Sequence, residues 1–245
     1  MTHKTKGIVL RTVKYGETSV ITTVYTELFG IRSYIVKGIR QQGKRGEGKA
    51  NYFQPAAILE MVVYHNELKN LQFIKEFEWS FLYQHVLFNV VKNAVAMYVV
   101  ELLQHSLKQP EPNPKLFYHI EDTLKQLDKG ANTFAANLPL YFTLHLGREL
   151  GFQIQGEYSK LTPVLDLQEG QFTTEIPTHS YYINGEHASI TSKINSINFY
   201  SDLTQIELNK TTRRELLQGY QHYVGLHIES FKEMKSLRVL REVLS

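Results

Sequence analysis

The apolar residues of this chain change period once, near Trp79, and that change constrains the fold more than any other feature of the sequence. Before Trp79, β-branched and aromatic residues gather in short runs, separated by turn formers such as Lys14–Thr18 and Glu27–Gly30. Runs of this length and composition are typical of strands. Five strands are predicted in this way: Ile8–Val13, Val20–Tyr25, Ser33–Lys37, Ala57–Tyr64 and Leu71–Trp79.

Five strands within about 75 residues favour a small closed barrel. Among small barrels, the five-stranded oligonucleotide/oligosaccharide-binding (OB) fold fits this number best, and we expect it to fill residues 1–80. Such barrels usually carry a helix between their third and fourth strands. Here a glycine-rich basic segment, Lys37–Lys49, is expected to take the place of that helix.

After Trp79 the apolar period becomes helical. Residues 86–107 are apolar around most of the helix circumference, which predicts a buried helix. Two amphipathic stripes follow, which end at Gly130 and Gly151. We therefore expect an α+β protein, in which the barrel is followed by a mainly α-helical domain, residues 81–245.

A small module interrupts the helical pattern at about residues 152–200, where the 3.6-residue period is lost. Within it, Val164–Thr174 predicts a hairpin with a glycine-containing turn. Thr212 and Glu215 then have the spacing of a capping box, which predicts the start of a late helix. Residues 231–244 would form a last helix with a cationic side.

Basic residues are concentrated at the beginning of the chain. Residues 1–50 hold ten lysines and arginines against three carboxylates, whereas the whole chain holds 27 against 24. Five cations lie in the segment Lys37–Lys49, namely Lys37, Arg40, Lys44, Arg45 and Lys49. So much glycine and charge cannot bury a core, so we expect a solvated loop that contacts a polyanion such as the phosphate backbone of a nucleic acid. The alternative is a loop that serves only solubility.

Two further groups are candidate DNA contacts. Arg11, Lys14 and Tyr15 lie at the first predicted strand and its turn, where barrels of this type touch their polymer. Tyr15 would stack on a base, or it is an ordinary exposed turn tyrosine. Near the end of the chain, Lys232, Lys235 and Arg238 would either extend the DNA path or form a solvated helix face.

The chain has no cysteine, which excludes disulfides, thiolate metal sites and cysteine nucleophiles. Its ten histidines are scattered, with no compact His/Asp/Glu cluster, so neither a metal nor another cofactor is expected. The sequence also lacks a phosphate-binding loop, a Gly-x-Ser-x-Gly motif and a His-Glu-x-x-His motif. We therefore expect a protein that is not an enzyme.

The sequence also gives no sign of a membrane partner. The richest apolar run, residues 86–107, is interrupted by Asn89, Lys92, Asn93 and Glu101. No apolar stretch typical of a secretory signal follows Met1. A cytoplasmic protein, associated with the nucleoid, is the expectation.

Short motifs along the chain, taken in order and spacing, resemble the RecO family of bacterial recombination mediators. In the barrel region these motifs are Lys6–Arg11, Tyr15–Ser19, Gly30, Val36–Arg40, and Gln54-Pro55 with Leu59-Glu60. Leu150–Phe152 resembles the end of the family's central helix, and Phe231–Arg238 resembles its closing Leu-Lys-Ser-Arg segment.

The resemblance implies a non-enzymatic DNA repair and recombination mediator, built from an OB barrel, a helical domain and a small inserted module. It implies binding of single- and double-stranded DNA and annealing of complementary strands. It also implies work with a RecR-type partner to help load the RecA recombinase onto DNA coated with single-stranded-DNA-binding protein. Many members carry a four-cysteine zinc site in the inserted module, but this chain has no cysteine there, so zinc is not expected.

The resemblance further implies that a pocket in the helical domain holds the acidic, Phe-ended tail of single-stranded-DNA-binding protein. Arg148 is the only lysine or arginine between Ala131 and Gln155, and it is our candidate for that contact, the alternative being an ordinary helix-surface arginine. The alternative function for the whole chain is an OB-fold RNA-binding protein or protein-interaction scaffold without annealing activity.

Overall fold

The structure is a computed structural model that describes residues 1–39, 48–108 and 110–244. It divides into two compact units. The barrel unit comprises Met1–Leu87 and Leu103–Asp128, and the helical unit comprises Phe88–Leu102 and the chain from Lys129 onward. The chain therefore passes between the two units three times.

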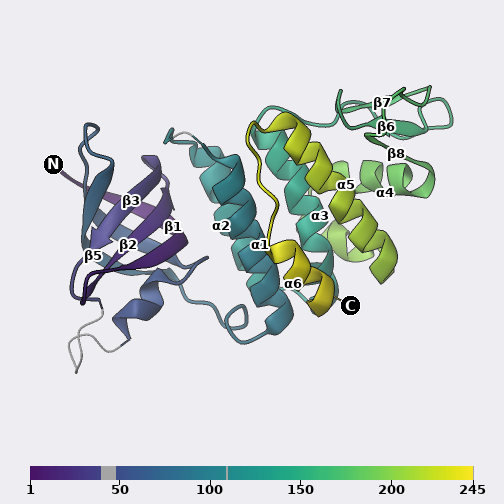
Figure 1. Cartoon of the computed structure of the whole chain (residues 1–245). Helices are drawn as coiled ribbons and strands as arrows, with labels where there is room; N and C mark the ends of the chain where they lie inside the picture. Colours follow the sequence, from purple (N-terminus) through teal and green to yellow (C-terminus); the bar gives the residue numbers. More distant parts are fainter. Residues whose placement is uncertain (40–47, 109, 245) are drawn as a thin grey trace. The chain divides into compact units, whose positions relative to one another are not determined.

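The barrel unit is built on a closed five-stranded barrel (Figure 1). Its strands are β1 (Thr2–Tyr15), β2 (Ser19–Thr26), β3 (Gly30–Val36), β4 (Ile58–Tyr64) and β5 (Leu71–Phe81). The strand order is β1-β2-β3-β5-β4, and β1 closes the barrel by pairing with β4. The pairing of β3 with β5 is parallel, and the other four are antiparallel. This is the arrangement of an OB fold, and the predicted fold class is confirmed.

Alternation along each strand produces the core of the barrel. In β2, Val20 and Val24 are buried, whereas Ile21 and Thr23 between them are only half-buried. Successive side chains of a strand point to opposite faces, so one set fills the interior and the other faces outward. The interior is filled by Val9, Val20, Val24, Tyr34, Val36, Ile39, Phe53, Ala57, Leu59, Met61 and Val63.

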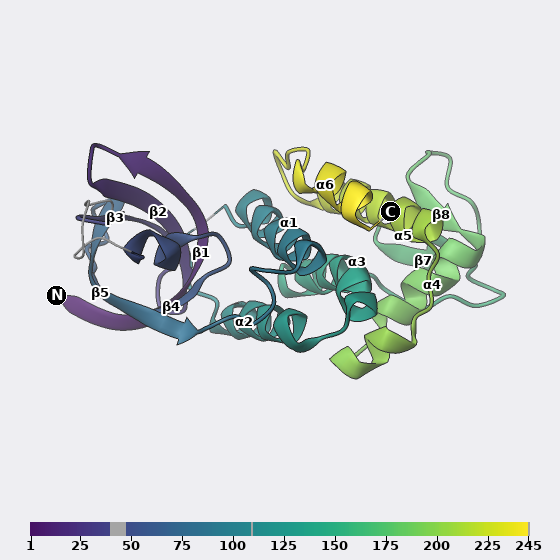
Figure 2. The ribbon, with the colours of Figure 1, turned by 90° about the horizontal axis from the view of Figure 1, so that it is seen from below.

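A short 3-10 helix, η1 (Lys49–Phe53), lies across one end of the barrel, and the two views show it there in blue (Figures 1 and 2). Phe53 is 2% exposed within the core, and the ring of Tyr52 stacks on Trp79 with 4.7 Å between ring centroids. We expected the basic loop Lys37–Lys49 to take the place of the usual helix. That expectation was wrong, because a short helix begins at Lys49, the last residue of the loop. A single turn is too short to give a helical period in the sequence, although its two aromatic residues cover the end of the core.

Helix α2 (Pro114–Lys129) packs on the barrel within the same unit. Its Glu121 is 4% exposed and accepts hydrogen bonds from Lys6 Nζ of β1 at 3.1 Å and from Lys125 Nζ at 2.9 Å. Two cations around one buried carboxylate satisfy the charge that burial would otherwise leave unpaired. At the start of the helix, Tyr25 Oη donates to the carbonyl of Asn113 at 3.2 Å.

Asp128, at the other end of α2, anchors the segment by which the chain leaves the barrel. Its Oδ1 accepts from the backbone amides of His85 at 2.7 Å and Val86 at 2.8 Å, and its Oδ2 accepts from the amide of Gln84 at 3.0 Å. Burial opposes ionisation of this carboxyl, but the three amide hydrogen bonds outweigh it and lower its pKa below the usual value.

The helical unit contains the first part of α1 (Val90–Ser106), together with α3 (Asn132–Glu149), α4 (Gly185–Asn195), α5 (Lys210–His227) and α6 (Ser236–Val243). Most of α3 is buried, and it packs against α4 and α5 (Figure 1). A second 3-10 helix, η2 (Tyr200–Gln205), also lies against α3.

A buried polar chain ties three helices of this unit together. Gln221 Nε2 donates to Tyr98 Oη at 2.7 Å, and Tyr98 Oη lies 2.6 Å from Thr143 Oγ1. Thr143 uses its own proton on the carbonyl of Pro139, at 2.6 Å, so Tyr98 is the donor in the middle link. Because every member has a partner, burial of these polar groups costs little.

A small three-stranded sheet, in the order β7-β6-β8, forms the inserted module. Strands β6 (Val164–Asp166) and β7 (Gln171–Thr173) make the predicted hairpin, and β8 (Tyr182–Asn184) adds an edge that the sequence pattern did not show. Asp166 holds the turn, because its Oδ1 accepts from the amides of Gln168 at 2.8 Å and Glu169 at 3.1 Å. Its Oδ2 lies 3.3 Å from His179 Nε2.

Three helical expectations need correction. Helix α5 begins at Lys210, and its N-cap is Asn209, whose side chain accepts from the Thr212 amide at 2.9 Å, so Thr212 is not the cap of a capping box. The last helix covers only Ser236–Val243 of the predicted 231–244. Helix α4 was not expected, because one of its three buried positions is Thr191, and a polar residue there hides the apolar stripe.

No helix in the described residues is long and apolar enough to cross a membrane. The same part of the chain contains no group of three or more His, Cys, Asp or Glu side chains placed to hold a metal ion.

Replacing Asp128 by Asn should destabilise the protein by about 1–3 kcal/mol, because three backbone amides, of which that of Val86 is buried, lose a charged acceptor. Since the folded state lowers the pKa of Asp128, its contribution is present above the unfolded pKa of about 4 and is lost as the pH falls through the folded value. The gap between wild-type and D128N in urea unfolding should therefore shrink below about pH 4. Asp122→Asn, on the exposed side of the same helix, is the matched control. Equal stability of D128N and D122N at pH 7 would contradict this role.

Candidate nucleic-acid interface

Strand pairing places a row of apolar side chains on the outside of the barrel. Each member lies directly opposite the next on the neighbouring strand, and directly opposed residues share one face of a sheet. We call this row the outer strip: Val13, Ile21, Ile35, Phe73 and Tyr64. The row thus crosses all five strands.

The outer strip faces water. The residues that precede or follow its members point inward, since Thr22 and Tyr34 are fully buried and Gln72 is 3% exposed. Within the strip, Val13 is 39% exposed, Phe73 40% and Tyr64 46%. The barrel therefore carries a continuous apolar row on its solvent side, which is unusual for positions where alternation would place polar residues.

Cationic side chains border the outer strip. Arg11 is exposed two residues before Val13 on the same face of β1, and Lys14 and Tyr15 are exposed at the end of that strand. Lys37 follows β3, and its Nζ lies 5.4 Å from the centroid of the Phe73 ring. Arg11, Tyr15 and Lys37 thus lie at outward positions of the barrel, whereas Lys14 lies opposite the inward-facing Val20 and reaches solvent at the end of the strand.

Two turns flank this face. The β1–β2 turn follows Tyr15, next to the pairing of Val20 with Val36, and the β4–β5 turn precedes Leu71, which lies opposite Ser33. In OB folds, the corresponding two loops and the face between them bind oligonucleotides. The sequence-predicted cations Arg11, Lys14 and Lys37 lie near this face, and their contact with DNA stays a prediction.

The rest of the basic segment gives less information. Lys49 is exposed at the first position of η1. Arg40, Lys44 and Arg45 lie outside the described residues, so their contact with DNA stays a prediction.

The three predicted cations near the end of the chain belong to the helical unit. Lys232, Lys235 and Arg238 are all exposed. Lys235 and Ser236 donate their amides to the two carboxylate oxygens of Glu101, at 3.0 and 2.7 Å, and this cap fixes the start of α6. Lys235 and Arg238 therefore project from a helix end whose position is defined.

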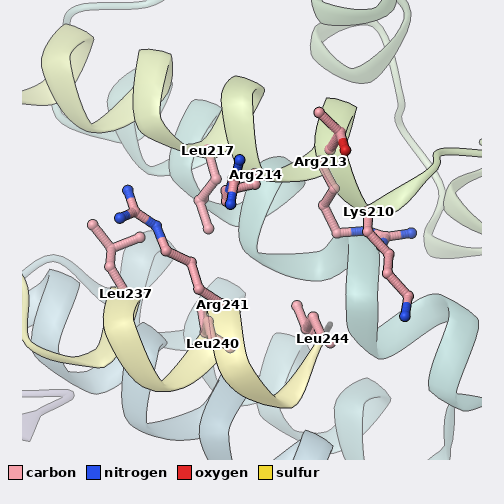
Figure 3. Close-up of a pocket in the computed structure, with 9 residues that line it drawn as sticks. Lys210, Arg213, Arg214, Leu217, Leu237, Leu240, Arg241 and Leu244 are labelled. Carbon is pink, nitrogen blue, oxygen red and sulfur yellow. The ribbon is translucent and has the colours of Figure 1, made fainter.

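A pocket of about 130 Å³ opens between α5 and α6 in the same unit. Its floor is apolar, and its rim is formed by cations, as the close-up shows (Figure 3). Arg214 and Leu217 extend from α5 toward Leu237 and Arg241 of α6. The lining residues are Lys210, Thr211, Arg213, Arg214, Leu217, Leu237, Leu240, Arg241 and Leu244.

The rim of this pocket is electrostatically unbalanced. The first turn of α5 contains no acidic residue, although a helix N-terminus favours negative charge. Arg213 is held in place because its Nε donates to Asn137 Oδ1 at 3.1 Å and its NH2 group donates to the carbonyl of Leu208 at 3.0 Å. Burial lowers the pKa of Arg213. An anion at this rim would meet both the helix end and the guanidinium groups.

Comparison with known proteins covers both units. The family model described as "Recombination protein O N terminal" matches residues 1–83, and "Recombination protein O C terminal" matches residues 87–238. The chain belongs to the RecO family.

Curated relatives agree over the full length of the chain. The "DNA repair protein RecO" of Christiangramia forsetii is 33% identical over 239 residues, which is 98% of each chain. The proteins of the same name from Flavobacterium psychrophilum and Azobacteroides pseudotrichonymphae are 31% and 28% identical over 99% of each chain. The predicted family is thereby confirmed, and with it a role in DNA repair. The RecO family is one of repair mediators rather than of known catalysts.

Arg148, the predicted tail contact, has a structural partner in this RecO-family chain. It lies in the last turn of α3, and its NH2 group donates to the carbonyl of Asn195, the last residue of α4, at 2.7 Å. A cation at a helix C-terminus interacts favourably with the unpaired carbonyls there. A role of Arg148 in partner binding stays a prediction.

Sequence reasoning missed two features of this RecO-family chain. It missed the outer strip, because register between strands decides which apolar residues of neighbouring strands line up outside. It also missed the pocket rim of Lys210, Arg213 and Arg214, although the cationic run at the start of α5 was a usable signal.

Replacing Arg148 by Met should lower the free energy of unfolding by about 1–2 kcal/mol, because the Asn195 carbonyl loses a charged donor while the apolar stem is kept. Lys193→Met, an exposed cation in the last turn of α4, is the control and should change stability little. Urea unfolding of the two variants measures the difference, and an unaltered R148M would assign Arg148 no structural role.

Proposed function

We propose that this RecO-family protein is a DNA repair and recombination mediator that binds single- and double-stranded DNA and promotes annealing of complementary strands. In the same proposal it works with a RecR-type partner and helps to load the RecA recombinase on DNA coated with single-stranded-DNA-binding protein. The observation that carries the proposal is the outer face of the barrel. There Arg11, Lys14 and Lys37 border the face that OB folds use for oligonucleotides.

The charges on this face suit a phosphate backbone. Phosphates shed counterions when cations approach them, so binding by such a face depends on salt and little on sequence. The exposed side chains of Lys232, Lys235 and Arg238 supply a second cationic surface, in the helical unit. Annealing needs two strands on one protein, and two DNA-binding surfaces, one in each unit, are a means of holding them.

The pocket between α5 and α6 suits the acidic, Phe-ended tail of single-stranded-DNA-binding protein. An acidic peptide complements the rim cations, Arg214 and Arg241 among them, and a terminal aromatic ring suits the leucine floor. This assignment is an alternative to Arg148, whose guanidinium donates to the carbonyl of Asn195 in α4.

Charge reversal tests the DNA assignment. Replacing Arg11, Lys14 and Lys37 together with Glu should weaken binding to single- and double-stranded DNA by about ten- to a hundredfold at 100 mM salt. The salt slope of the logarithm of affinity should become shallower by about two to three. The readouts are fluorescence anisotropy with labelled oligonucleotides and an annealing assay. Unchanged affinity would remove these residues from the interface.

The control carries the same change in net charge at exposed lysines elsewhere, Lys129, Lys160 and Lys193, each replaced by Glu. Equal losses of affinity in both triple variants would indicate only the electrostatic field of the whole protein.

An RNA of equal length distinguishes the alternative function. A clear preference for RNA, or no binding to either polymer at low salt, would favour the RNA-binding protein or interaction scaffold.

The pocket assignment has its own test. Arg214→Ala and Arg241→Ala should each weaken binding of an acidic peptide with a C-terminal Phe by about tenfold or more, because each removes a charged donor. Arg148→Met and Lys193→Ala should leave its affinity within about twofold. Calorimetry with the synthetic peptide gives the affinities, and a larger loss for R148M than for the pocket variants would return the contact to Arg148.

A further inference from the structure

We infer that the outer strip is a base-stacking surface, with Phe73 and Tyr64 as its stacking residues, and that it makes the barrel select single-stranded over double-stranded polynucleotide. The inference rests on the proposed function and adds to it the contact that distinguishes the two forms of DNA. Phosphate contacts alone cannot supply that distinction, since both forms present phosphates.

The composition of the strip indicates an apolar ligand surface. Five outward positions in one row are apolar, and Val13, Phe73 and Tyr64 are each between 39% and 46% exposed. Solvent-facing strand positions are normally polar, so a continuous exposed apolar row marks a place where something binds.

The neighbouring row on one side contains Arg11, Thr23, Ser33 and Leu71, which also lie opposite one another on β1, β2, β3 and β5. Tyr15, Ser19 and Lys37 lie on the other side, where β1, β2 and β3 end or begin. On β4 and β5 this side continues with Val62 and Glu76, and Glu76 is paired with Lys75 at 3.1 Å. Both sides carry a cation, Arg11 on one and Lys37 on the other. An apolar row with cations beside it on β1 and at the end of β3 matches a single strand, whose bases are apolar on their faces and whose backbone is anionic. A protein partner with a plain apolar patch would gain nothing from the cations.

Phe73 and Tyr64 form the part of the strip that suits bases best. They lie directly opposite each other on β5 and β4, and both rings are exposed. Base stacking on an aromatic ring requires a base that has left its own stack, which a single strand offers and an intact duplex does not. The rings therefore add affinity for single strands alone.

Lys37 links stacking to phosphate binding. In the free protein its Nζ lies 5.4 Å from the centroid of the Phe73 ring, a cation–π distance. A base that stacks on Phe73 would displace the ammonium group from the ring, and the phosphate of the same strand would receive it. In the free protein the ammonium group of Lys37 thus lies over the Phe73 ring, and in the complex it would contact a phosphate.

Leucine substitutions test the inference with little risk to folding, because Phe73→Leu and Tyr64→Leu keep an apolar side chain and remove only the aromatic face. Each should weaken binding to a single-stranded oligothymidylate by about five- to a hundredfold, and the double variant should lose more. Affinity for a duplex of equal length should change by less than about twofold, and the salt slope should be unaltered, since no phosphate contact is removed. Phe73→Tyr keeps an aromatic ring at this position, so it should bind the single strand about as tightly as the wild type. Tyr181→Leu, at an exposed tyrosine (42%) immediately before β8, is the matched control.

Photocrosslinking provides a test on the unaltered protein. An iodouridine-substituted single strand should crosslink to Phe73 or Tyr64, and the tryptic peptide that contains Phe73 is bounded by Lys69 and Lys75. Crosslinks that avoid both residues would overturn the inference.

Equal weakening of single-strand and duplex binding by F73L and Y64L would overturn the stacking role while the protein still binds DNA. Unchanged DNA binding with altered self-association in sedimentation would also overturn it, and would assign the strip to a second copy of the chain. The failure of the proposed function is a different result, namely a wild-type protein that binds neither form of DNA.

Discussion

The parallel pairing of β3 with β5 is the constraint on which the surface of the barrel unit depends. This parallel ladder sets Ile35 opposite Phe73, and the antiparallel ladders extend that line to β1 and β4. A shift of one residue in any ladder would turn the side chains of that strand to the other face and break the row. The buried Tyr34, which alternates with the row, opposes such a shift because its ring would be moved from the core into water.

The sequence predicted the barrel well because strand formation in this chain follows local patterns. The five predicted runs coincide with β1 to β5 except for Lys37 and Ala57, which lie one residue outside β3 and β4, since β-branched residues and turn formers act over a few positions. Register is different, because it depends on contacts between residues far apart in the chain. Phe73 and Ile35 are separated by a segment that includes η1 and β4, and no local period states that they are neighbours.

Polar residues at buried positions limited the prediction of the helical unit. Thr191 accepts a hydrogen bond from Tyr220 Oη at 2.9 Å inside the protein, so α4 lacked an apolar stripe. Asn209 rather than Thr212 caps α5, because both residues are good caps and only the backbone path decides between them. Arg148 was predicted as a contact because of its charge, and the structure shows that its guanidinium, like that of Arg213, donates a hydrogen bond within the fold. The sequence shows which residues are charged, but not which guanidinium groups donate hydrogen bonds within the fold.

The stack of Tyr52 on Trp79 makes the two units optically distinct. Trp79 is the only tryptophan in the chain, and its position at the end of the barrel couples its emission to the packing of η1. The helical unit has no tryptophan of its own but contains five of the six α-helices wholly or in part among the described residues, so circular dichroism near 222 nm reports mainly on that unit. Comparison of the two signals during denaturation would show whether the barrel and the helices unfold as one cooperative body or as two.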